Sequence, residues 1–100
     1  TIKRHGIKLL MIVMNDAAYG SEIHKLRVDG HDETGAAFGQ TDLASVARGF
    51  GLGGVSFTNL EELDAAFEDF VSGEKAALWD FHISDQIASP VMRRLTGAKK

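Results

Sequence analysis

Asn15 and Asp16 are the two residues of this 100-residue chain whose types and position best suit chemistry. Both side chains carry oxygen ligands, and they follow directly on the apolar run 9–14. Two small alanines come next and would let the backbone approach a ligand closely. Gly20 and Ser21 can then begin a helix, whose free amides favour an anion. Oxygen ligands beside an anion site suit Mg²⁺ that is shared with a phosphate group.

The same turn also has a purely structural interpretation. Asn, Asp and Gly are frequent in turns, because Asn and Asp bond to the nearby backbone and Gly tolerates left-handed conformations. On residue types alone, a metal and phosphate site and a simple polar turn both remain open for residues 15–20.

The apolar run places this turn at the end of a strand. A continuous apolar segment that ends in a turn signal is typical of a strand buried on both faces of a sheet. We predict such a strand over residues 7–14. Ligands of open α/β sheets bind just beyond the carboxyl ends of the strands. The turn at 15–20 therefore lies where a ligand is expected.

Two further strands are predicted, over residues 55–57 and 75–83. In the longer one, one face is expected to be more buried than the other, because two sets of residues alternate. The more apolar set consists of Ala77, Trp79, Phe81 and Ile83, and the more polar set consists of Leu78, Asp80 and His82.

Helical spacing of apolar residues predicts two amphipathic helices between the strands. The first takes Thr41 as its N-cap, and the second takes Asn59 as its cap and runs to residue 72. The expected buried face of the first consists of four residues that recur at helical spacing: Leu43, Val46, Ala47 and Phe50.

Shorter elements are predicted in the remaining segments. A short helix is expected over 21–27, and the glycine-containing stretch 28–40 is expected to be a functional or mobile loop. Ser89 and Pro90 have the N-cap and first-turn signature of a last helix over 91–95, followed by a disordered tail at 96–100.

Strands alternate with helices along the chain. This order predicts an α/β fold of three layers, with a mostly parallel sheet, right-handed crossovers and helices on both faces. Residues 1–6 have the basic last turn and the closing glycine of a helix end. They fit either a piece of a longer polypeptide or a frayed end.

Composition excludes several classes of function. The net charge of -3 and a pI near 5.7 give no reason to expect nucleic acid or an anionic membrane as a partner. The chain has no cysteine, so disulfides and cysteine chemistry are excluded. The longest apolar run is too short to span a bilayer, and no signal peptide is visible, so a cytoplasmic location is expected.

Two other patterns are not assigned to a site. The glycines at 49–54 close a predicted helix and open a strand, whereas a dinucleotide-binding fingerprint follows a strand and opens a helix. They are interpreted as a helix cap and a tight turn. The four histidines lack the spacing of a metal site, and although His82 lies near the carboxyl end of a strand, no histidine site is predicted.

Residues 12–20 resemble a known cofactor motif. Their sequence, Ile-Val-Met-Asn-Asp-Ala-Ala-Tyr-Gly, is similar to the second half of the thiamine-diphosphate motif in the acetolactate synthase, benzoylformate decarboxylase and pyruvate oxidase family. Residues 42–51, 60–67 and 77–83 are similar to the helices and the strand that follow in that family. The resemblance implies that residues 1–100 are part of the family's C-terminal, diphosphate-binding domain and share its fold.

The resemblance implies a role for the residues of the turn. Asp16 would supply a side-chain ligand to Mg²⁺, and Ala18 would supply a backbone carbonyl ligand. Asn15 would shape the turn and contact the cofactor. Many members have asparagine where this chain has Asp16, and the extra carboxylate adds negative charge beside a diphosphate.

The residues after the turn also receive roles from the resemblance. Tyr19, Gly20 and Ser21 would lie along the diphosphate, partly through their backbone amides. Ser21 and Ile23 would border the space around the thiazolium ring and the substrate. The implied cofactors are thiamine diphosphate and Mg²⁺, and the implied substrate is a small-molecule 2-keto acid that undergoes decarboxylation or carboligation.

Two parts of the family's active site are not in this chain. One is the first half of the motif, Gly-Asp-Gly, which carries the other Mg²⁺ carboxylate; the other is the cofactor-activating glutamate, which a different domain supplies. No catalytic residue is therefore assigned here. The resemblance implies that the chain works with the remaining domains of a longer polypeptide, as a homodimer or homotetramer, and that residues 1–100 alone are inactive.

A second interpretation belongs to a different class of function. The chain could be a non-enzymatic regulatory or interaction module of flavodoxin-like shape, because fold alone does not fix function. A naturally split enzyme, with the activating glutamate on a separate subunit, is a third. A Gly-Asp-Gly encoded upstream of Thr1 would favour an enzyme over the module.

Overall fold

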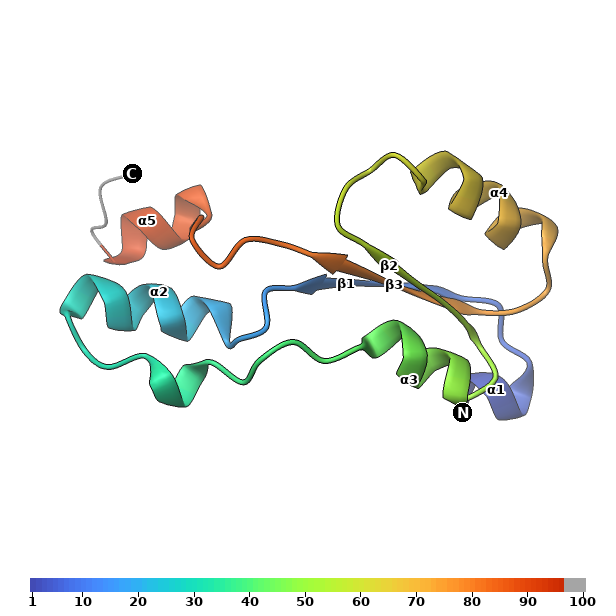
Figure 1. The fold of residues 1–100 in the computed structure, drawn as a ribbon, viewed down its shortest axis with the longest axis horizontal. Coiled ribbons are helices and arrows are strands. Elements are labelled where there is room, and N and C mark those ends of the chain that lie inside the picture. Colours follow the sequence, from blue (N-terminus) through green and yellow to red (C-terminus); the bar gives the residue numbers. More distant parts are fainter. Residues whose placement is uncertain (97–100) are drawn as a thin grey trace. The chain divides into compact units, whose positions relative to one another are not determined.

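The computed structural model of the protein describes residues 1–96, which form two compact units (Figure 1). The first unit contains residues 1–15 and 42–82, and the second contains residues 16–41 and the chain from Ile83 onward. The boundary between them falls between Asn15 and Asp16, so the turn predicted to carry chemistry begins where one unit passes into the other.

The first unit contains a parallel sheet of three strands. These are β1 (Leu10–Asn15), β2 (Gly53–Phe57) and β3 (Ala77–His82), in the order β1-β3-β2. Both neighbouring pairs are parallel, with Leu10 and Gly53 in register with Ala77. The predicted α/β fold with a parallel sheet is confirmed, and all three carboxyl ends meet at one edge of the sheet.

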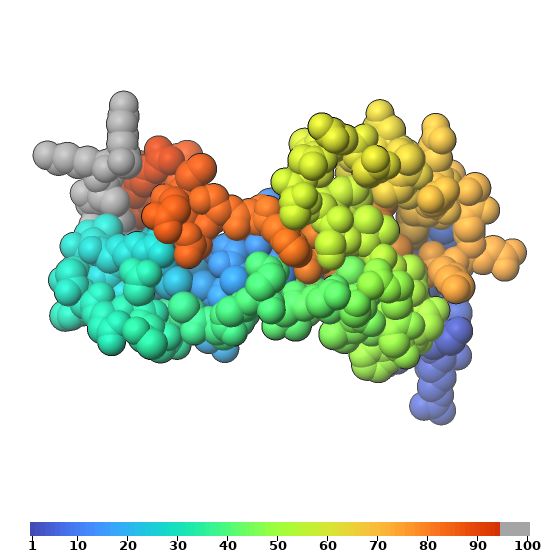
Figure 2. All heavy atoms as spheres, viewed as in Figure 1, coloured from blue at the N-terminus to red at the C-terminus, as the bar shows by residue number. Residues whose placement is uncertain are grey.

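Helices cover both faces of this sheet (Figure 1). On one face, α4 (Leu63–Ser72) packs on the core formed by Phe57, Ala77 and Trp79. On the other, α3 (Leu43–Gly49) contacts β2 and β3, and the space-filling view shows its atoms packed directly on those of β2 (Figure 2). The contact is close enough that a Cβ on Gly54 would lie 2.2 Å from the Ala44 carbonyl oxygen.

Three aromatic rings pack against one another in the core beneath α4. Phe57 stacks on Phe81 at a centroid distance of 4.7 Å, and Trp79 meets Phe57 edge-on at 5.4 Å. Such pairs add about 0.5–1.5 kcal/mol each beyond the area that they bury. These rings belong to the alternating apolar set of β3 and its neighbour β2, so that part of the pattern is confirmed.

The more polar set of β3 is also largely covered, although the alternation predicts that its face is the less buried of the two. Asp80 is completely buried, more deeply than Trp79 beside it. The reason is that α3 covers this face of the strand, so both faces of β3 lie against helices. The Asp80 carboxyl group, in the middle of an apolar strand, is therefore buried between the sheet and α3.

The predicted strand over residues 7–14 is confirmed in its main part, but the prediction that it is buried on both faces was wrong. The strand β1 begins later, at Leu10, and includes Asn15. Ile12 is 57% exposed and Met14 is 64% exposed. The physical reason is that β1 lies at an edge of this sheet, whereas the two covering helices pack mainly over β2 and β3.

The N-terminal helix end predicted from the sequence is confirmed. The helix α1 (Ile2–His5) ends at Gly6, which has the left-handed conformation φ 62°, ψ 31°. The amide of Gly6 donates to the Lys3 carbonyl, and that of Ile7 donates to the Ile2 carbonyl. Glycine suits this position because a Cβ would be strained there.

Both helix caps predicted between the strands were wrong. Asp42, not Thr41, caps α3, because its carboxylate accepts from the Ser45 amide at 3.0 Å. Asn59 caps no helix; its side chain accepts from the Glu61 amide in a turn, and α4 begins at Leu63. In each case the polar side chain bonds to a nearby amide, but the chain enters the helix later than the pattern suggested.

The predicted buried face of α3 needs a similar correction. Ala47 is buried as expected, but Val46 and Phe50 are exposed, and Ala44 is buried in their place. Small residues face the sheet here because α3 lies so close to Gly54. Larger side chains on that face would force the helix away from β2.

The second unit contains α2 (Gly20–Asp29), the 3₁₀ turn η1 (Thr34–Ala36) and α5 (Pro90–Thr96). The predicted last helix is confirmed, including its cap: the Met92 amide donates to Ser89 Oγ at 3.0 Å. The predicted tail lies, beyond Thr96, outside the described residues. None of the described helices is long and apolar enough to cross a membrane.

The stretch 28–40 is more ordered than the predicted loop. The first residues belong to α2, which ends at Gly30 in a left-handed conformation with φ 73°. Past η1, Ala37 forms an antiparallel bridge with Ala18. This stretch therefore reaches back to the turn that follows β1.

Candidate functional site

The turn after β1 contains a strained backbone position. Ala17 adopts φ 61°, in the left-handed region that residues with a Cβ rarely occupy. Such a conformation persists only where surrounding contacts hold it, and it is frequent at functional sites. The turn is therefore held in one shape by its neighbours.

Residues 36–38 provide that support within the second unit. The Tyr19 amide donates to the Ala36 carbonyl at 2.8 Å, and the Phe38 amide donates to the Ala17 carbonyl at 3.1 Å. These bonds flank the Ala18–Ala37 bridge and do not use the carbonyl of Ala18. The two aromatic rings, Tyr19 and Phe38, meet edge-on at 5.2 Å.

The Ala18 carbonyl is consequently directed away from this pairing. In an antiparallel bridge whose bonds come from the flanking residues, the central residue turns its own N–H and C=O away from its partner. No described hydrogen bond uses this oxygen. That is the condition that a backbone carbonyl ligand for a metal must meet.

Asp16 lies over the first residue of α2. A Cβ on Gly20 would be only 2.2 Å from Asp16 Oδ2 and 3.2 Å from its carboxyl carbon. The carboxylate thus occupies the space that any other residue type at position 20 would fill. The sequence places a glycine where a side chain and the carboxylate could not coexist.

The N-terminus of α2 has its amides available for an anion. Tyr19 is the N-cap and makes no side-chain cap bond, while its carbonyl accepts from the Ile23 amide. The amides of Gly20 and Ser21 therefore point out of a helix of ten residues. Ile23 is completely buried and anchors this first turn.

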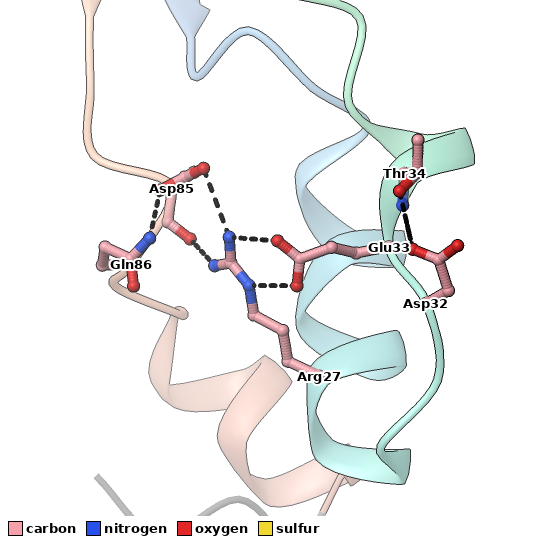
Figure 3. Close-up of polar contacts among 6 residues, drawn as sticks. All are labelled: Arg27, Asp32, Glu33, Thr34, Asp85 and Gln86. Carbon is pink, nitrogen blue, oxygen red and sulfur yellow. Dashed lines mark hydrogen bonds and ion pairs between the residues drawn. The ribbon is translucent and has the colours of Figure 1, made fainter.

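An ion-pair cluster at the far end of α2 holds two segments against that helix (Figure 3). Arg27 donates from Nε and Nη2 to the two carboxylate oxygens of Glu33, at 2.8 and 2.9 Å. It also donates from Nη2 to Asp85 Oδ2 at 3.3 Å and from Nη1 to the Asp85 carbonyl. We call Arg27, Glu33 and Asp85 the arginine cluster.

Protonation behaviour in the arginine cluster follows from these bonds. The hydrogen bonds from Arg27 hold the pKa of Glu33 below its ordinary value. Those to Glu33, and then to Asp85, raise the pKa of Arg27. The pKa of Asp85 is lowered, first by a bond from the Gln86 side chain and then by Arg27. All three groups are therefore charged at neutral pH.

A second polar group lies at the carboxyl edge of the sheet, in the first unit. Asn15 Nδ2 donates to Asp80 Oδ2 at 3.3 Å, and His82 Nε2 lies 3.3 Å from the same oxygen. Asn15 is in register with His82, so all three side chains share one face of the sheet. The other oxygen, Asp80 Oδ1, is buried and has no hydrogen-bond partner among the described residues.

The structure therefore divides the predicted residues between the units. The predicted Mg²⁺ ligands, Asp16 and Ala18, lie in the second unit with residues 19–21, whereas Asn15 ends a strand of the first. The part of the chain that the structure describes holds no cluster of three metal-binding side chains. Any metal bound here would take only part of its ligands from these residues.

Sequence reasoning missed Asp80, the arginine cluster and the role of residues 36–38. The only sequence signal for Asp80 is a carboxylate between Trp79 and Phe81 in an apolar strand, on the face that the alternation predicts to be the less buried one. The other two features join residues that are distant in the sequence or bond through the backbone, and side-chain spacing does not report them.

A cavity of about 710 Å³ lies elsewhere in the first unit. It lies between α4 and the amino ends of β2 and β3, where Gly53 and Ala76 contribute to its wall. In open α/β sheets, ligands bind at the opposite edge, beyond the carboxyl ends of the strands. Size alone does not make this cavity the functional site.

Comparison with known proteins identifies the family of the chain. A search of curated proteins finds no match. The model of the family described as "Thiamine pyrophosphate enzyme, C-terminal TPP binding domain" matches residues 1–81. This range contains β1, β2 and all of β3 except its last residue, together with the turn after β1 and all of α2. The chain therefore belongs to the thiamine pyrophosphate enzymes and corresponds to their C-terminal, cofactor-binding domain.

Proposed function

We propose that this domain binds the diphosphate of thiamine diphosphate together with Mg²⁺, in an enzyme that decarboxylates or carboligates a 2-keto acid. The observation that carries the proposal is the position of the Asp16 carboxylate over Gly20, at the open N-terminus of α2. A carboxylate and free helix amides side by side suit a metal ion bridged to a phosphate.

The residues present fit a Mg²⁺ ion. Asp16 offers a carboxylate and Ala18 offers a carbonyl that no described hydrogen bond uses. Mg²⁺ commonly takes only one or two carboxylates from a protein and completes its shell with phosphate oxygens and water. We propose that a Gly-Asp-Gly outside residues 1–100 supplies the second carboxylate.

The diphosphate would lie along the start of α2. Gly20 and Ser21 present their backbone amides there, whereas the Tyr19 amide is bonded to the Ala36 carbonyl and does not contribute as the resemblance implied. The positive end of the helix dipole favours the negative charge. The lack of a Cβ at Gly20 leaves room for Asp16 beside the phosphates. The side chain of Ser21 would border the thiazolium and substrate space, whereas Ile23, which the resemblance also places there, is buried and would support the start of the helix from below.

Thiamine diphosphate, when bound, supplies the carbanion chemistry on the keto acid. The residues of this chain hold and orient it, and none of them is proposed as a catalytic residue. The activating glutamate would come from another domain in a homodimer or homotetramer. The family match supports this enzyme interpretation over a non-enzymatic module.

Calorimetric titration of the full-length protein with thiamine diphosphate and Mg²⁺ tests the proposal. The variant Asp16→Ala should weaken Mg²⁺-dependent cofactor binding by about tenfold or more, which is typical when a metal site loses a supporting group. Asp32→Ala is the matched control, because the Asp32 carboxylate accepts from the amide and the hydroxyl of Thr34 in a turn of the same unit. Unchanged affinity in Asp16→Ala would remove the metal role.

The coding sequence upstream of Thr1 is a second test. A Gly-Asp-Gly about ten to fifteen residues before Thr1 would supply the remaining carboxylate on a strand-turn-helix unit of ordinary length. If the upstream sequence lacks this tripeptide, the proposed metal site has no second carboxylate at the expected place. The interpretation as a non-enzymatic module is then favoured.

A further inference from the structure

We infer that Asp80 is a positioning residue for the cofactor site, acting through Asn15. The inference rests on the proposed function, because it assigns the carboxylate a role in holding the turn that carries Asp16. The two side chains meet across neighbouring strands, with Asn15 Nδ2 at 3.3 Å from Asp80 Oδ2. Neither residue belongs to the part of the turn that would contact the diphosphate through helix amides.

Burying the Asp80 carboxylate costs free energy, which argues that this side chain has a role beyond packing. The side chain is completely buried, and one of its two oxygens has no partner among the described residues. Burying a carboxylate is expensive unless its bonds are complete, and an apolar side chain of similar volume is often as stable or more so. Leu78 and Phe81 show that this strand accepts apolar residues.

The Asp80 carboxylate bonds to Asn15, the residue directly before the proposed metal ligand. Asn15 is the last residue of β1, and its peptide bond leads directly to Asp16. The bond to Asp80 Oδ2 restricts the orientation of the asparagine side chain. His82 Nε2 lies 3.3 Å from the same oxygen, so Asp80 Oδ2 is contacted by both Asn15 and His82.

Functional sites need this kind of support to keep their groups within a fraction of an ångström. Asp80 lies on the middle strand of the sheet, flanked on both sides by paired strands. It therefore links the rigid centre of the sheet to the residue before the proposed metal ligand. Loss of the link should loosen the end of β1 at Asn15, the residue that is covalently joined to Asp16.

Cofactor binding by full-length variants tests this inference. Asp80→Leu removes the acceptor at similar volume and should weaken Mg²⁺-dependent binding of thiamine diphosphate by about tenfold. Asp80→Asn keeps an acceptor oxygen and should retain affinity within about threefold, as neutral hydrogen bonds replace charged ones. Trp79→Phe is the control: it disturbs the neighbouring buried residue on the opposite face and should leave cofactor affinity unchanged.

A double-mutant cycle separates positioning from general damage to the fold. In an Asn15→Ala background, Asp80→Leu should lower cofactor affinity by less than about a further twofold, because the two residues act through the contact that they share. Additive losses would overturn the inference, and so would wild-type affinity in Asp80→Leu. If Asp16→Ala loses affinity while Asp80→Leu does not, the proposed function stands and this inference fails. If the wild-type protein does not bind the cofactor, both fail.

An exchange of the two side chains decides the matter if Asp80→Leu does not fold. Asn15→Asp places two carboxylates together and should weaken cofactor binding. Adding Asp80→Asn restores one amide and one carboxylate in the opposite order, and should recover part of the affinity. Recovery supports the inference, and its absence overturns it.

Discussion

The Asp16 carboxylate and Gly20 share one space: a Cβ on Gly20 would lie 2.2 Å from Asp16 Oδ2. The clash would involve only the far end of a side chain that can rotate. A substitution at position 20 should therefore displace the carboxylate without unfolding the helix.

We expect Gly20→Ala to lose function but not stability. Alanine is favoured over glycine in a helix by up to about 1 kcal/mol, so thermal stability should be unchanged or higher. Mg²⁺-dependent cofactor affinity should fall, because Asp16 must turn away. Gly35→Ala is the control, since nothing lies within 4 Å of the new Cβ. Calorimetry and thermal unfolding measure the two effects, and equal affinity in both variants would contradict the prediction.

The left-handed conformation of Ala17 predicts a distinct pattern of stability. Ala17→Gly should be neutral or stabilising, because relief of about 1–2 kcal/mol of strain offsets the greater freedom of glycine in the unfolded chain. Ala17→Val should be destabilising, because a β-branched residue is an outlier at positive φ. Ala37→Val, at the extended position across the bridge, should be tolerated. Urea unfolding measures all three, and tolerance of valine at position 17 would be inconsistent with this backbone.

The arginine cluster predicts how stability responds to acid. Because Arg27 lowers the pKa of Glu33 in the folded protein, this contribution is present above the unfolded value of about 4.3 and is lost as pH falls through the lower folded value. Arg27→Gln should therefore be less stable at neutral pH and lose less on acidification. Melting temperatures between neutral and acid pH measure this.

Lys25→Gln is the matched control for the arginine cluster. It removes one positive charge from the same helix at an exposed position, so it should keep the acid dependence of the wild-type protein. If Arg27→Gln and wild-type curves run parallel as pH falls, the cluster does not contribute to folding.

The cap of α3 gives a direct test of helix entry. The Ser45 hydroxyl and amide lower the pKa of Asp42. Asp42→Ala should lower the melting temperature, whereas Thr41→Ala, at the residue favoured by the sequence pattern, should not. The difference should vanish in strong acid, where Asp42 is protonated. Equal melting temperatures at neutral pH would count against this cap.

The sequence was sufficient for the order and the direction of the main elements. Alternating strands and helices predicted the parallel sheet, and Ser89 with Pro90 predicted the last helix, because these signals are local. The same is true of the turn after β1, whose residue types are unusual at the end of an apolar strand. A single sequence predicts well the contacts between residues that are close together in the chain.

Burial and long-range pairing could not be predicted in the same way. Ile12 and Asp80 are an exposed apolar residue and a buried charged one, because strand order and helix placement, not local pattern, decide which faces are covered. The bridge between Ala18 and Ala37 depends on backbone groups that every residue carries. Arg27 meets Asp85 only after the chain has passed through the other unit.

The strand order β1-β3-β2 has a consequence for how the protein is made. The middle strand is the last one to be synthesised, so neither β1 nor β2 has its neighbour until residues 77–82 have left the ribosome. Until then both strands carry unpaired edges, which are prone to join other chains. None of these three strands can therefore pair with another of them before residues 77–82 have been made.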